Sequence, residues 1–143
     1  MPYRFLEDIA TADVAFEATA ESREELFVES AAALLRTMVE DPTTVCRDRE
    51  LTIELEENEF DVLLFAFLQE MVFLKDARQL LLHADKVLIG EDDGTFRLRA
   101  VVRGEEIDRK RHPLIVDVKA VTLHRFRAGL AGNIWQAVVV LDV

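Results

Sequence analysis

The second half of the chain contains two segments of the kind that form β-hairpins. In the first, "ADKVLIGEDDGTFRLRAVVRG", two strand-like runs flank Asp93-Gly94, a pair that supplies the positive φ values that a tight hairpin turn demands. In the second, "LIVDVKAVTLHRFRAG" and "NIWQAVVVLDV" are joined by a Gly-containing loop at 129–133. A hairpin pairs its two strands antiparallel, so the sequence predicts a largely antiparallel sheet.

The first half adds two helices to these strands. Ser22 and Glu25 form a capping box that opens a helix, and Pro42 ends it because proline disfavours helix in the residue before it. A second helix, which we expect Asn58 to cap, keeps its apolar spacing to about Asp76.

The remaining segments complete the predicted fold. "YRFL", "DVAFEATA" and "LTIELEE" have the alternation of half-buried strands. Strands therefore outnumber helices. This predicts an α+β fold with two main helices packed on one face of a largely antiparallel or mixed β-sheet. We expect one domain over residues 1–143.

Composition excludes several classes of protein. The net charge is -11, which repels phosphate backbones, so direct tight nucleic-acid binding is not expected. No apolar run approaches the roughly 20 residues of a membrane span. Cys46 is the single cysteine, so no internal disulfide forms. With no signal-peptide pattern at the N-terminus, this predicts a cytoplasmic protein.

The usual signatures of enzymes are missing from the sequence. There is no phosphate-cradling Gly-rich loop, no Gly-x-Ser-x-Gly turn and no His-Glu-x-x-His pattern. Cys46 has no base beside it in sequence, which favours a structural residue, buried like most single cysteines, over a nucleophile. The three histidines are scattered and do not have the spacing of zinc ligands. We therefore predict that the protein is not an enzyme.

The segment "WQAVVVLDV" carries the most unusual chemistry. Asp142 and the α-carboxylate of Val143 place two anions at the end of an apolar strand, where they repel each other unless a cation compensates. Calcium and magnesium prefer such oxygen ligands. Asp13, which opens "DVAFEATA", supplies a third carboxylate if the first and last strands meet. Alternation alone does not show which strands are neighbours.

Four motifs together resemble the archease family. "YRFLEDIATADVAFEA", "GEEIDRKRH", "VKAVTLH" and "VVLDV" occur in the order and spacing of that family, over essentially the whole chain. The resemblance implies an accessory protein of tRNA splicing and RNA repair that activates an RtcB-type RNA ligase. It implies promotion of the ligase's GTP-dependent guanylylation and multiple turnover, with GTP bound by the ligase. It also implies an alternative role, as a chaperone-like modulator of tRNA methyltransferase specificity.

The same resemblance assigns functional residues. It implies a divalent-metal site, with calcium favoured, formed by Asp13, Asp142 and Val143, and it makes Lys119 a further functional residue that faces the partner. Two segments differ from the family pattern. "EDIATADV" lacks the histidine that many archeases have before the first long strand, and "RFRAGLAGN" is unusually basic and Gly-rich.

The sequence is also compatible with two functions of other classes. One is a stand-alone metal-dependent phosphoesterase, which requires a base or nucleophile near the cation. The other is a general chaperone-like binder with exposed apolar patches.

Overall fold

A computed structural model describes residues 2–6 and 13–143. The elements follow in the order β1 (Tyr3–Leu6), β2 (Asp13–Ala20), α1 (Arg23–Met38), a short 3-10 helix (Pro42–Thr44), β3 (Arg49–Glu57), α2 (Phe60–Arg78), β4 (Leu80–Asp92), β5 (Thr95–Glu106), β6 (Ala120–Ala131) and β7 (Ile134–Asp142). No helix in these ranges is both long and apolar enough to cross a membrane.

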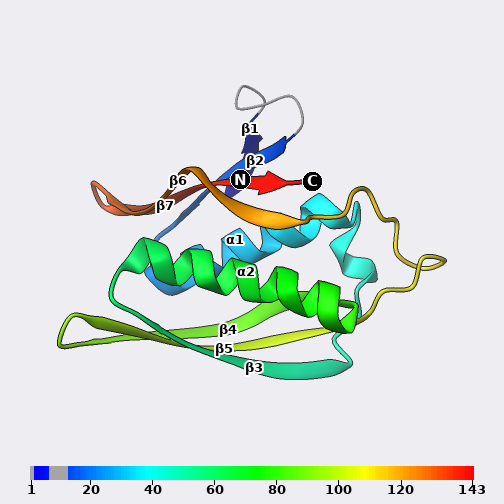
Figure 1. The fold of residues 1–143 in the computed structure, drawn as a ribbon, viewed down its shortest axis with the longest axis horizontal. Helices are drawn as coiled ribbons and strands as arrows, with labels where there is room; N and C mark the ends of the chain where they lie inside the picture. Colours follow the sequence, from blue (N-terminus) through cyan, green and yellow to red (C-terminus); the bar gives the residue numbers. More distant parts are fainter. Residues whose placement is uncertain (1, 7–12) are drawn as a thin grey trace.

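The strands form two antiparallel sheets. One has the order β1-β2-β7-β6 and the other β3-β5-β4. Both helices lie between the sheets: α1 contacts β2 and β4, and α2 contacts β6 and β3 (Figure 1). The predicted α+β class with two main helices is confirmed. The division into two sheets was not visible in the sequence, because alternation shows the faces of a strand and not its neighbours.

The local signals for α1 act as predicted. Ser22 is its N-cap, and the Ser22 hydroxyl accepts the Glu25 N–H at 3.1 Å. The predicted cap of α2 is wrong. Glu59 takes the N-cap position, while the side-chain oxygen of Asn58 accepts a hydrogen bond from the Thr95 hydroxyl at 3.4 Å. Asn58 therefore contacts the first residue of β5, and no side chain caps the helix at its N-cap position.

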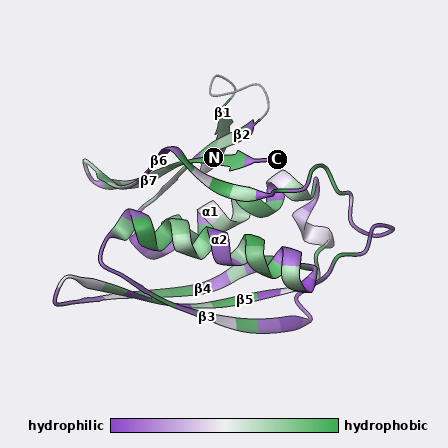
Figure 2. Ribbon diagram, viewed as in Figure 1, coloured by the Kyte–Doolittle hydropathy of each residue, from purple (hydrophilic) through white to green (hydrophobic). Residues whose placement is uncertain are grey.

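The core fills the space between the two sheets. Phe16, Phe27 and Phe67 are fully buried, and each such side chain contributes about 1.5–3 kcal/mol of burial energy. The ring of Phe27 lies 5.5 Å from that of Phe67 and 5.6 Å from that of Phe60, which ties α1 to α2. Figure 2 shows hydrophobic residues at intervals along α2, as expected for a helix with one face packed against the core.

The four-stranded sheet determines where the candidate site forms. β7 runs between β2 and β6, and it ends where β2 begins. Farther along β6, four residues between Thr122 and Arg127 lie opposite Val139 alone, because the register shifts between Thr122–Val140 and Arg127–Val138. The shift leaves the pairing regular at the end where β6 starts, with Ala120 opposite Asp142.

Candidate metal site

The two predicted aspartates are direct neighbours across the β2–β7 pair. Asp13 is the first residue of β2, Asp142 is the last of β7, and the two are register partners. Residues directly opposite in an antiparallel pair project from the same face with Cβ atoms about 4.5–5.5 Å apart. The condition stated from the sequence, that the first and last long strands must meet, is therefore met.

Val143 follows directly at the same corner. Its side chain is half-buried and packs against the hydrophobic core. Packing of this side chain restrains the residue next to Asp142. Asp142 is itself exposed and Asp13 is half-exposed, so the carboxylates remain accessible from solvent.

Lys119 lies at the same end of the sheet, on the β6 side. It immediately precedes the Ala120–Asp142 pair, and its backbone N–H donates to the Asp142 carbonyl at 2.8 Å. The side chain of Lys119 is exposed. The structure thus brings Asp13, Lys119, Asp142 and Val143 to one corner, which we call the acidic corner.

The donor set of the acidic corner suits a hard divalent cation. Carboxylate oxygens from Asp13, Asp142 and Val143 are the ligand type that calcium prefers, and calcium tolerates irregular and incomplete protein coordination. Like charges directly opposite one another in a sheet are destabilising. A cation relieves that repulsion, so these residues fit the metal that the sequence resemblance implies.

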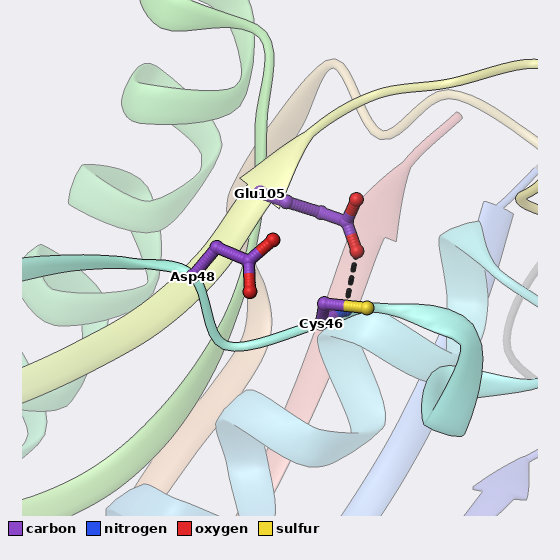
Figure 3. Close-up of side chains that lie close together, drawn as sticks. All are labelled: Cys46, Asp48 and Glu105. Carbon is purple, nitrogen blue, oxygen red and sulfur yellow. Dashed lines mark hydrogen bonds between the residues drawn. The ribbon is translucent and has the colours of Figure 1, made fainter.

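A second group of potential ligands lies elsewhere, where the end of β5 meets the loop after α1. Cys46 Sγ and the carboxylates of Asp48 and Glu105 offer atoms within 4.8 Å of one another (Figure 3). Cys46 is exposed, which corrects the expectation of a buried cysteine. The Glu105 carboxylate already accepts the Cys46 backbone N–H and pairs with Arg111.

We interpret this second group as a structural contact between β5 and the loop after α1, and the environment of His112 supports that interpretation. Its side chain is buried, and its Nε2 lies 3.6 Å from the Glu105 carboxylate. Nδ1 accepts the Asp108 backbone N–H at 2.9 Å, so in a neutral ring the proton is on Nε2. Nε2 then has no lone pair for a metal, and it makes no hydrogen bond within the described part of the chain. Burial lowers the pKa of His112, and Arg111 lowers it further against the opposing effect of Asp108.

Sequence reasoning missed the burial of two polar residues that support these regions. His112 is 2% exposed although it lies in the charged run "EEIDRKRH". Lys75 is 3% exposed near the end of α2. The sequence did contain a signal for the burial of Lys75, because its position continues the apolar stripe of the helix. The unusual segment before Asp13 covers residues 7–12, which lie outside the described part of the chain.

Comparison with protein families agrees with these observations. The model of the Archease protein family (MTH1598/TM1083) matches residues 3–143. The chain is 34% identical over 143 residues to a protein named archease from Methanopyrus kandleri, with 100% of both chains covered. It is 32% identical to a protein named archease from Pyrococcus furiosus, over 93% of this chain and 94% of that one.

Solved structures show the same fold. Protein 1598 of Methanobacterium thermoautotrophicum matches with a TM-score of 0.85 and 31% identity, over 99% of both chains. An archease of Thermotoga maritima, described as a possible chaperone, matches with a TM-score of 0.60 over 98% of both chains. Because the identity is 20%, this second similarity supports the fold alone. The family model and the full-length relatives together show that this chain belongs to the archease family.

Proposed function

We propose that this chain is a non-enzymatic accessory protein of tRNA splicing and RNA repair that activates an RtcB-type RNA ligase. It promotes the ligase's GTP-dependent guanylylation and multiple turnover, and GTP is bound by the ligase. Family membership supports this role. The structural observation that supports it is the register pairing of Asp13 with Asp142 at the corner that also holds Lys119.

We further propose that the acidic corner binds a divalent cation, with calcium favoured. Asp13, Asp142 and the Val143 α-carboxylate hold it, which offsets the repulsion between the paired aspartates. A cation held by few protein oxygens keeps coordination positions that a phosphate or a partner's carboxylate can fill. The corner is thereby suited to contact the ligase close to its nucleotide chemistry.

Charge supports a protein partner that is itself basic. The net charge of -11 complements a cytoplasmic enzyme that handles RNA, and such complementarity raises encounter rates and selects partners. Lys119 is an exposed cation beside the carboxylates. We assign it to the contact with the ligase, where it pairs with an acidic group.

The decisive experiment is multiple-turnover RNA ligation by a purified RtcB-type ligase, with and without this protein. Wild type should raise the number of turnovers, whereas Asp142→Asn should not, because one ligand of the cation is lost. Asp92→Asn is the matched control, since Asp92 ends β4 in the other sheet and is exposed. Absence of stimulation by the wild type would overturn the accessory role. Full stimulation by Asp142→Asn would overturn only the part played by the metal.

The role of Lys119 is separable from that of the cation. Lys119→Met should retain calcium binding measured by isothermal titration calorimetry, while stimulation of the ligase falls. Lys110→Met removes an exposed lysine from the loop after β5 and is the control. Equal stimulation by both lysine variants would contradict a partner-facing Lys119.

One observation favours the chaperone-like alternative, modulation of tRNA methyltransferase specificity. Large apolar side chains are exposed on α2 and β6, with Phe73 at 59% and Leu123 at 73%, and exposed apolar surface is typical of protein-binding regions. Methylation assays with Phe73→Ser and Leu123→Ser would test it. This role is favoured if the wild-type protein changes which tRNA position is methylated and the two variants do not.

Phosphoester hydrolysis by the isolated protein would instead favour a stand-alone enzyme.

A further inference from the structure

The side chain of Lys75 is polar, buried and directed at the backbone next to the acidic corner. It lies in the last turn of α2 and is 3% exposed. Its Nζ donates to the Val118 carbonyl at 2.7 Å and pairs with the carboxylates of Asp76, at 2.7 Å, and Asp117. A buried ammonium needs such partners, and here they hold it at one position.

The Val118 carbonyl belongs to the same peptide group as the Lys119 N–H. That N–H donates to the Asp142 carbonyl at 2.8 Å. A hydrogen-bonded series therefore runs from the Lys75 ammonium through one peptide group to the backbone of Asp142. Because the ammonium polarises the peptide it binds, it strengthens the next hydrogen bond in the series.

Gln69 makes a second contact from the same helix. Its side-chain carbonyl accepts the Val121 N–H at 2.8 Å. Gln69 and Lys75 are six positions apart on the helix, about 9 Å of rise, and positions 118 and 121 are three apart, a separation of at most about 10 Å. The spacings match, so α2 can hold both ends of this segment at once. Val118 and Val121 are themselves buried, at 0% and 3% exposure.

We infer that Lys75 and Gln69 are positioning residues of the acidic corner. They hold residues 118–121 against α2, and this segment in turn sets the backbone of Lys119 and Asp142. The metal-related part of this inference rests on the proposed cation site. Neither residue contacts the cation; they act through the Val118–Lys119 peptide and the start of β6.

The first test uses the metal-free protein, so that it does not depend on the cation. Amide hydrogen exchange of Lys119 should accelerate about tenfold or more in Lys75→Met, as expected when a hydrogen bond with a charged partner is lost. Amides of β3 and β5 should keep their protection, since methionine preserves the buried volume. Lys86→Met, at an exposed position on β4, is the matched control. Unchanged exchange at Lys119, or equal acceleration in β3 and β5, would overturn the inference.

The second test measures calcium affinity by titration calorimetry well below the unfolding midpoint. Lys75→Met and Gln69→Leu should each weaken calcium binding several-fold. Gln69→Glu keeps the acceptor oxygen for the Val121 N–H and should restore wild-type affinity, a rescue that a loss of packing would not show. If wild type binds calcium and both weakening variants bind it equally well, the inference is wrong. If wild type binds no calcium, the cation proposal fails, and the exchange experiment alone decides the positioning role.

Discussion

The pairing of Asp13 with Asp142 sets two carboxylates against each other across neighbouring strands. Such a pair is destabilising without a counter-ion and favourable with one. Single residues at the acidic corner should therefore show effects on stability whose sign depends on calcium.

The effect of Asp13→Asn on the free energy of unfolding should change sign when calcium is added. In calcium-free buffer the variant should be more stable than wild type, by up to about 1 kcal/mol, because the repulsion is removed. With calcium at 100 times its dissociation constant, wild type should gain about 2.7 kcal/mol that the variant lacks. Urea unfolding in both buffers measures this, with Asp92→Asn as control. Identical shifts for Asp13→Asn in the two buffers would contradict a ligand role.

His112 should make stability depend on pH. Its pKa is lowered, first by burial and then by Arg111, so the folded state binds fewer protons than the unfolded state once pH falls below the ordinary histidine value of about 6.5. Its contribution to stability is present above that pH and is lost as pH falls through the folded-state pKa. Burial lowers the pKa of His83 as well, so its contribution has the same sign.

Replacement of His112 should reduce this dependence on pH. We expect His112→Gln to lose less free energy of unfolding than wild type does between pH 7.5 and pH 5.5, measured by urea unfolding. His124→Gln removes an exposed imidazole and is the matched control. A steeper loss in His112→Gln than in wild type would show that the sign assigned here is wrong.

Among the elements, β5 is restricted where it passes β4 at Gly104. A Cβ at this position would lie 1.7 Å from the Leu81 backbone carbonyl oxygen. Gly104→Ala should therefore force the strands apart and cost about 3 kcal/mol or more in urea unfolding. Gly90→Ala, in β4, would meet no atom within 4 Å and should change stability little. Similar losses for both variants would indicate that strand propensity, not the contact with Leu81, is responsible.

At the end of β7, the position of the α-carboxylate is itself testable. One residue added after Val143 moves that carboxylate by about 3.3 Å, so calcium affinity should fall. Val143→Ile keeps both the carboxylate and the apolar packing, and should bind calcium as wild type does. Titration calorimetry compares the two. Unchanged affinity in the extended chain would remove the Val143 carboxylate from the proposed site.

For the whole molecule, net charge should govern the encounter with the ligase. A chain with a charge of -11 should associate with a basic partner at a rate that falls about tenfold or more as salt is raised from low to high concentration. Stopped-flow mixing over a salt series measures the rate constant. A rate independent of salt would show that charge complementarity does not guide this partner.

Local signals in the sequence predicted much of the secondary structure. The cap at Ser22 and the turn at Asp93-Gly94 depend on interactions within a few residues. In the turn, φ is 51° at Asp93 and 75° at Gly94. The apolar run that ends at Asp142 was also visible, and the metal site predicted there stays a prediction. The cap of α2 was predicted wrongly because a tertiary contact with Thr95 competes for Asn58.

What the sequence by itself determined is therefore the set of elements, the faces they bury and the acidic ending of β7. Only the tertiary structure decided that the strands form two sheets, that Asp13 lies opposite Asp142, and that Lys75 lies beneath the segment that carries Lys119. The physical reason is that alternation and helical spacing report the burial of each residue. The partner that covers each face depends on how the whole chain packs around one core.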